Sequence, residues 1–186
     1  MAKNRDNVRV YGDLDSEAFL APKGSTLPVA LTDPIDPFAS LGWLSEDGID
    51  FEVATDSTKF KGWQGGATLR VKVTSTEKTI KFQCLEETPG VTELYFDHGA
   101  PVVTGTGATA VAKVDLPEGI GTVERAAVFK FVDGDVVKYL CCELIQITER
   151  GTISHKNDDM TLYEFTAEIV GEAYILTNAP AFTEAA

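Results

Sequence analysis

The 186-residue sequence is poor in the side chains on which most enzyme chemistry depends. It contains two His, three Cys and two Met. His98 is expected in a turn and His155 in an exposed loop, and no pattern predicts that they converge into a catalytic pair or a metal site. Three Cys are too few for a disulfide framework, which favours synthesis in a reducing cytoplasm.

The remaining candidates for chemistry are weak. Cys141 and Cys142 are adjacent on a predicted strand, so their side chains are expected to point to opposite faces as small buried groups. The segment "GTGATA" (residues 105–110) has the glycine spacing of a dinucleotide loop, but Thr- and Val-rich sequence follows it where a helix is required. The sequence therefore predicts no catalytic residue, no metal site and no cofactor.

Long apolar runs are also missing. No run approaches the roughly 18 residues of a membrane helix, so we expect no membrane insertion. The N-terminal "MAKNRDNVRVYGD" lacks the apolar segment of a secretory signal.

Positive charge is scarce. Sixteen Lys and Arg stand against 29 Asp and Glu, which gives a formal net charge of −13. Tight binding of nucleic acid requires a basic surface, so this balance argues against it. Solubility is the simplest interpretation, but the balance is also compatible with a surface past which nucleic acid slides without sticking.

A β-strand pattern dominates the sequence from residue 67 onward. The stretch "TLRVKVTSTEKTIKFQCLEE" alternates apolar and polar residues and predicts a hairpin that turns at "STEK", with Arg70, Lys72 and Lys81 on its free face. A second hairpin is predicted around Asp133-Gly134, a good tight-turn pair. A further strand is predicted in "MTLYEFTAEIVG".

One short helix is predicted over residues 88–97. Thr88 can cap it, Pro89 suits its first position, and Val91 and Leu94 fall on one face. The expected fold is mainly β: an antiparallel β-sandwich or partly closed barrel with one short flanking α-helix.

The first 66 residues differ from the rest because they are rich in Pro and Gly and contain only short apolar runs. Trp43 and Trp63 each follow a glycine within a long polar stretch, where they either anchor an interface or cap the core of their own domain. We expect a single domain over residues 1–186. Its parts are an N-terminal arm (1–38), a long loop (39–66), a β core (67–170) and a C-terminal segment (171–186).

Four stretches together resemble a known family. They are "VRVYGDLDSEAFLAPKGSTLPVAL", "LGWLSEDGI", "GWQGG" and the hairpin-plus-helix "TLRVKVTSTEKTIKFQCLEETPGVTELYF". In order and spacing, across nearly the whole chain, they resemble the major tail proteins, or tail tube proteins, of long-tailed siphovirus-type bacteriophages, especially those infecting actinobacteria.

The resemblance implies a structural virion protein without enzymatic activity or cofactor. Hexameric rings, whose sheets join into an inner barrel, would stack into a tube through which double-stranded DNA passes without specific binding. Expected partners are further copies of the chain, the tape measure protein, the tail terminator and the tail-tip or baseplate proteins. The expected location is the phage tail, after assembly in the host cytoplasm.

By the same resemblance, residues 41–66 are expected to stack one ring on the next. The candidate inter-subunit contacts are Leu41, Trp43, Leu44, Ile49, Phe51 and Trp63. Candidates for the wall of the lumen are Glu164, Thr166 and Glu168, which share one strand face. The basic residues Arg70, Lys72 and Lys81 either pack against acidic groups of a neighbour or make the lumen mixed in charge.

Two other classes share parts of this pattern. A soluble β-sandwich that binds a carbohydrate or a receptor would have similar strands and an exposed aromatic platform. A small enzyme would need a convergent polar site, which the sequence does not predict. Self-association separates the tube subunit from both, because only the tube subunit must polymerise.

Overall fold

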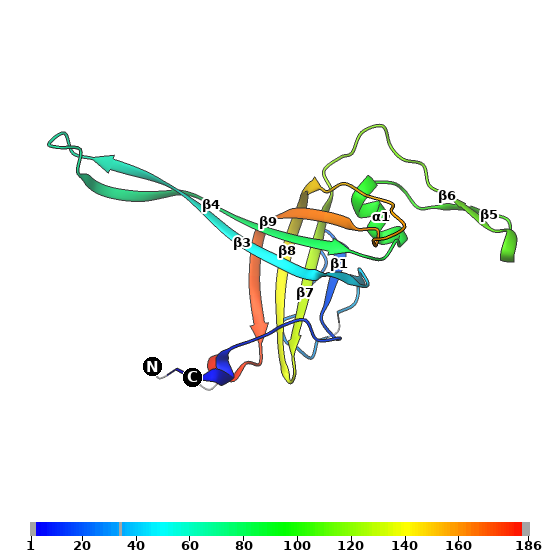
Figure 1. Cartoon of the computed structure of the whole chain (residues 1–186), viewed down its shortest axis with the longest axis horizontal. Coiled ribbons are helices and arrows are strands. Elements are labelled where there is room, and N and C mark those ends of the chain that lie inside the picture. Colours follow the sequence, from blue (N-terminus) through cyan, green and yellow to red (C-terminus); the bar gives the residue numbers. More distant parts are fainter. Residues whose placement is uncertain (1–2, 34, 184–186) are drawn as a thin grey trace.

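The computed structural model describes residues 3–33 and 35–183, and a seven-stranded antiparallel sheet forms its centre (Figure 1). The strand order is β2-β1-β7-β8-β9-β4-β3, and β5 and β6 form a separate small sheet. The elements are η1 (Arg5–Asn7), β1 (Glu17–Pro22), β2 (Ala39–Ser40), β3 (Leu44–Lys61), β4 (Thr68–Cys84), α1 (Pro89–Phe96), β5 (Val102–Thr104), η2 (Gly107–Thr109), β6 (Val111–Lys113), β7 (Glu124–Asp133), β8 (Val136–Arg150), β9 (Tyr163–Thr177) and α2 (Pro180–Thr183).

The predicted mainly antiparallel β fold with a short flanking helix is confirmed, but the sheet is not closed into a barrel. Strands β2 and β3 form its two edges. The predicted hairpin at Asp133-Gly134 is the β7–β8 connection, in which Gly134 adopts the left-handed φ of 57°. No helix in residues 3–33 and 35–183 combines the length and the apolar character needed to cross a membrane.

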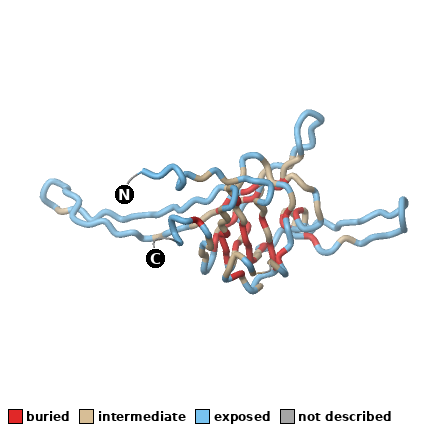
Figure 2. Tube along the Cα trace, turned by 90° about the horizontal axis from the view of Figure 1, so that it is seen from below, coloured by how far each residue is buried: buried red, intermediate tan, exposed pale blue. Residues whose placement is uncertain are grey.

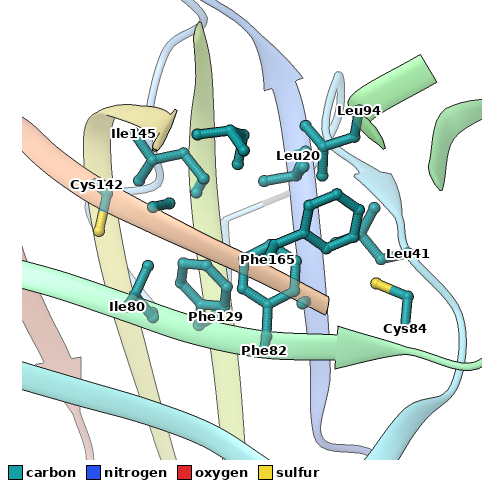
Figure 3. Packing of buried hydrophobic residues seen from close by; sticks show 14 of the residues in the cluster. Leu20, Leu41, Ile80, Phe82, Cys84, Leu94, Phe129, Cys142, Ile145 and Phe165 are labelled. Atoms are coloured by element: carbon teal, nitrogen blue, oxygen red, sulfur yellow. The ribbon is translucent and has the colours of Figure 1, made fainter. Parts of the chain in front are cut away.

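The central strands are apolar on both faces over part of their length, so the sheet carries one buried cluster on each side. Cys142 belongs to one buried cluster and its neighbour Cys141 to the other, as the alternation along a strand predicts. Three buried rings dominate the first cluster: Phe82 lies 5.8 Å from Phe129 and 5.3 Å from Phe165, measured between ring centroids (Figure 3).

Helix α1 covers the first cluster and begins where the sequence predicts. The backbone N–H of Val91 donates to the Thr88 hydroxyl oxygen at 3.3 Å, and Pro89 occupies the first turn. Val91 and Leu94 are buried against the sheet. At the other end, the guanidinium of Arg150 donates to the Leu94 carbonyl, where the helix dipole favours positive charge.

The predicted N-terminal arm is wrong for most of its length. Strand β1 belongs to the main sheet, and residues 22–33 and 35–38 cover the second buried cluster. Phe38 is buried there, and the Tyr174 hydroxyl donates to the Pro28 carbonyl at 2.6 Å. Proline and glycine break the regular periodicity of this segment, yet its scattered apolar side chains still reach a core. Residues 1–2, 34 and 184–186 lie outside the described residues.

The predicted loop over residues 39–66 and the predicted turn at "STEK" are also wrong. Strands β3 and β4 form one long hairpin, closed by the Gly62 N–H donating to the Ala67 carbonyl at 2.8 Å. Apolar residues of β4 switch from odd positions (69, 71, 73) to even positions (80, 82, 84). A turn can cause such a switch, but here a β-bulge between the pairs Asp56↔Ser75 and Ser57↔Val73 causes it.

Two hairpins project from the body of the molecule in opposite directions (Figure 1). The outer part of β3–β4 is exposed along nearly its whole length, and the buried residues concentrate in the body (Figure 2). The β5–β6 hairpin, also exposed, extends from the end of the molecule at which α1 lies.

Candidate functional site

Four of the six predicted contact residues line one groove, and the other two lie apart from it: the four are Trp43, Leu44, Ile49 and Phe51, and the two are Leu41 and Trp63. Leu41 is only 4% exposed and packs in the first buried cluster of its own subunit, so almost none of its surface can contact a neighbouring subunit. Leu44 and Ile49 pack partly against the same cluster. The other three are exposed: Trp43 over 64% of its surface, Phe51 over 47% and Trp63 over 95%.

One face of the hairpin continues the core of the subunit outward. Because the β-bulge restores the alternation, most exposed apolar side chains of the outer hairpin lie on the same face as the buried Ile80 and Phe82, whereas Phe60, opposed to Arg70, lies on the other face. We call this the apolar face. Its exposed apolar members are Phe51, Val53, Leu69, Val71 and Val73, each between 47% and 74% exposed, and Lys78 and Lys59 lie among them, opposed to Val53 and Val71.

The opposite face of the hairpin is charged. It carries Arg70 and Lys72 near the tip and the opposed pair Asp50 and Lys81 near the body. The outer hairpin, residues 53–78, has five Lys or Arg and two Asp or Glu, a net charge of +3 in a chain of −13. All other residues together therefore carry −16, and the outer hairpin is a basic element on an acidic protein.

A groove of about 1100 Å³ lies at the base of the hairpin, between residues 11–17 and the start of β3. We call it the basal groove. Trp43, Phe51 and Phe131 supply its aromatic surface. The Lys138 ammonium lies 4.2 Å from the ring centroid of Tyr11, and desolvation by burial lowers the pKa of Lys138.

The basal groove is acidic. Five carboxylates and two ammonium groups line it, a net charge of −3. Three of the carboxylates already have partners: Glu86 accepts from the Trp43 N–H at 2.9 Å, Asp13 accepts from the Gly134 N–H at 2.7 Å, and Glu17 accepts from the Ser40 hydroxyl. The other two, Glu46 and Asp47, are exposed.

Strand β9 presents the predicted lumen residues on one face. Glu164, Thr166 and Glu168 point away from the first buried cluster, because Phe165 and Ala167 between them are buried in it. The strand register extends this polar face across the sheet into a row of five residues. The row is Glu52, Thr79, Glu168, Gln146 and Glu124. We call this surface the acidic face.

The three thiols are buried and both imidazoles are hydrogen-bonded within the fold. Burial raises the pKa of Cys84 and Cys142 to about 12 and that of Cys141 to about 11, which makes them poor nucleophiles. His98, which follows α1, is only 4% exposed, with ring nitrogens 2.7 Å from the Gly99 carbonyl and 2.9 Å from the Thr92 hydroxyl.

The possible dinucleotide loop and the possible metal ligands of the sequence do not form binding sites in the described structure. The segment 105–110 forms the turn between β5 and β6, where Gly105 and Gly107 adopt left-handed φ values of 81° and 57°. Within residues 3–33 and 35–183, no group of three or more His, Cys, Asp or Glu side chains is arranged to hold a metal ion.

The hairpin is exposed and has one mainly apolar and one charged face, and comparison with known proteins indicates the kind of protein to which it belongs. The sequence matches the family model described as "Phage tail tube protein" over residues 1–181. The chain belongs to the phage tail tube protein family. It is a structural component of the tail of a phage virion.

Two solved tail structures are similar to this tail tube protein at low identity. One is the tail of an empty gene transfer agent particle with C6 symmetry, at 12% identity and a TM-score of 0.46, covering 93% of this chain and 98% of that one. The other is the virion of a native gene transfer agent particle, at 11% identity and a TM-score of 0.44, covering 94% and 98%. No curated protein matches the sequence.

Sequence reasoning missed the two-faced hairpin and the basal groove of this tail tube protein. The groove joins residues 11–17 to β3, which are neighbours only in the fold, so no local pattern predicts it. The hairpin did leave a signal: five of the 16 Lys and Arg fall within residues 53–78 of an otherwise acidic chain.

Proposed function

We propose that the chain assembles into stacked homohexameric rings that form the wall of the tail tube, with no enzymatic activity. The observation that carries this proposal is the apolar face of the outer hairpin. Side chains such as Val53 and Val71 continue the core outward and are more than half exposed. An exposed apolar stripe of this kind is typical of a surface that a partner covers.

Strands β3 and β9 each have an edge without a partner strand in the described part of the chain, and these edges could pair with the sheet of a neighbouring subunit. Strand β9 pairs with β4 only as far as Glu168, so residues 170–177 have a partner strand on one side alone. Strand β3 is an edge over its whole length. Edges are a liability in a monomer, and pairing them around a ring would remove them.

The acidic face is the proposed wall of the lumen, with Glu164, Thr166 and Glu168 at its centre. Double-stranded DNA would pass along it without adhering, because the carboxylates repel phosphate at close range. Screening limits this repulsion to about 8 Å at physiological salt, so the charges act as a non-stick wall and not as a long-range field.

The remaining partners follow from the position of such a tube in a virion. A tape measure protein would fill the tube during assembly in the host cytoplasm, and a terminator and tail-tip or baseplate proteins would close its two ends. In this arrangement Leu44, Ile49, Phe51 and the two tryptophans serve contacts between subunits.

Negative-stain electron microscopy of the purified protein over a range of concentrations tests this proposal. We expect hollow tubes or rings of uniform width, with sixfold symmetry in end-on views. Rings of another order would contradict the hexamer but not the tube. Dispersed monomers at every concentration, together with binding to a glycan array, would instead support the soluble binding module.

A further inference from the structure

We propose that the tip of the β3–β4 hairpin of one subunit binds in the basal groove of a second copy. The contact places Trp63 on the aromatic surface of the groove and the basic residues of the tip beside Glu46 and Asp47. The inference rests on the proposed tube function and adds to it a specific pair of surfaces.

The tip is built to project a single large side chain. Trp63 is 95% exposed, the highest value of any large apolar residue in the described chain. It lies in the tight connection closed by the Gly62–Ala67 hydrogen bond, where Gly65 and Gly66 both have left-handed φ values, of 68° and 65°. A tryptophan held out in this way is typical of an interface anchor.

The basal groove suits such an anchor in size and chemistry. Its volume of about 1100 Å³ exceeds what one indole ring needs, so the tip backbone can enter as well. Trp43 and Phe51 line the groove and are 64% and 47% exposed, and both offer ring surfaces for aromatic packing.

The charges of the two surfaces are complementary. Lys59, Lys61, Arg70 and Lys72 flank the tip, and the groove carries a net charge of −3. Within residues 3–33 and 35–183, the structure pairs none of these four cations with an acidic side chain, and the same is true of Glu46 and Asp47. Unpaired charges of opposite sign on two surfaces favour association and set its orientation.

The hairpin cannot bring its own tip to its own groove. The groove includes Phe51 on β3, and ten residues of extended strand separate Phe51 from Lys61, about 33 Å at 3.3 Å per residue. The occupant of the groove must therefore be the tip of another copy. Different patches on the two copies make the contact head-to-tail, so it propagates into a ring or a stack.

Disulfide trapping in the full-length protein tests the contact. Gln64→Cys places a thiol at the tip and Ser45→Cys places one in the groove, without changing any charge. The three native thiols are fully buried, so only the introduced pair is open to oxidation. Copper phenanthroline in air accepts the two electrons, and both protons are released as the S–S bond forms.

We expect assembled Gln64→Cys/Ser45→Cys protein to give a ladder of covalent multimers on a non-reducing gel. The matched control is Gln64→Cys/Asn157→Cys, whose second thiol lies in the exposed loop between β8 and β9. Tubes without a ladder, or equal ladders from both proteins, would overturn the docking contact and leave the tube function standing. Wild-type protein that never assembles would overturn both.

A charge swap tests the electrostatic part independently. Lys61→Glu or Glu46→Lys alone should raise the protein concentration needed for assembly roughly tenfold, because every subunit carries the contact. The double variant should restore assembly to within about threefold of wild type. Lys156→Glu, in the β8–β9 loop, is the control and should have no effect. Failure of the double variant to recover would contradict this pairing.

Discussion

At the scale of single residues, exposure decides whether an aromatic side chain stabilises the subunit or serves contacts between subunits. Phe165 is fully buried between Phe82 and Tyr95, whereas Trp63 is 95% exposed. Trp43 is intermediate: the residue is 64% exposed, but its backbone N–H donates to the Glu86 carboxylate and its carbonyl accepts from the Leu85 N–H. Substitution of these residues therefore has separable consequences.

Trp63→Ala should abolish or strongly weaken tube formation while leaving the folded subunit intact. We expect the free energy of unfolding to change by less than about 0.5 kcal/mol, because the side chain has almost no contacts to lose. Thermal unfolding of the unassembled protein and sedimentation velocity measure the two effects. Trp43→Ala should follow the same pattern with a larger loss of stability. A variant that unfolds, yet whose folded fraction still polymerises normally, would contradict the assignment.

Phe165→Ala should have the reverse effect. Removing a fully buried ring leaves a cavity in the first cluster, and we expect a loss of about 3–5 kcal/mol in the free energy of unfolding. Urea denaturation of the unassembled protein measures it. Phe182→Ala removes the same ring from a residue that is 76% exposed, and this control should stay within about 0.5 kcal/mol of wild type.

The buried thiols predict a loss of stability at alkaline pH. Desolvation raises the pKa of Cys142 from 9.0 to about 12, so above pH 9 the unfolded chain releases a proton that the folded chain retains. The free energy of unfolding should therefore fall as the pH rises from about 9 towards 12, by up to roughly 1.4 kcal/mol per pH unit per thiol. Urea denaturation at pH 8, 9 and 10 measures the slope. Cys142→Ala should reduce it, and an unchanged slope would contradict this origin.

At the scale of elements, the β3–β4 hairpin consists of two functional parts. Its inner part belongs to the main sheet, where Phe82 and Ile80 complete the first cluster. Its outer part contributes nothing to that cluster and is held by its own cross-strand hydrogen bonds. The backbone pairing is therefore continuous along the whole hairpin, but we expect only the inner part to be required for the fold of the subunit.

Deletion of residues 53–78 should yield a folded subunit that does not assemble. Glu52 and Thr79 are directly opposed, so an Asn-Gly turn can join them without changing the register of the inner strands. We expect a cooperative unfolding transition close to that of wild type, with monomers at all concentrations by sedimentation velocity. Tube formation by the shortened protein would show that the outer hairpin is dispensable for assembly.

At the scale of the whole molecule, charge is distributed unevenly. The outer hairpin carries +3 and the rest of the chain −16, so copies attract one another at specific places while most of the surface repels polyanions. The three basic residues of this hairpin differ in position. Arg70 and Lys72 lie on its outer part, whereas Lys81 is directly opposed to Thr166 and lies on the acidic face itself.

Reversing charge on the proposed lumen wall should make assembled tubes retain DNA. We expect tubes of Glu164→Lys/Glu168→Lys protein to bind double-stranded DNA at low salt and to release it as salt rises, whereas wild-type tubes do not bind it. Electrophoretic mobility shift over a salt series measures this. Glu118→Lys, on the exposed segment after β6, is the matched control. Equal DNA retention by the control would argue that the acidic face is not the wall.

Local signals in the sequence predicted several elements correctly because each depends on near neighbours in the chain. Helix α1 follows from a cap at Thr88 and a proline beside it, and the β7–β8 hairpin from a glycine that adopts a left-handed φ. Opposite burial of Cys141 and Cys142 follows from the geometry of any strand. The family itself was predicted from the order of four such stretches.

Only the tertiary structure decided which segments pack and which project. Residues 17–33 and 35–38 look like a loose arm, yet residues 17–22 pair with β7 and the rest cover the second cluster, because burial depends on partners 90 or more residues away. In β4 the apolar residues change from odd to even positions. Either a turn or a β-bulge produces this change, and only the pairing with β3 shows that it is a bulge. Composition and alternation thus determined an acidic, mainly β subunit, and the resemblance of four stretches indicated the tail tube family, while long-range pairing determined the projecting hairpin and its groove.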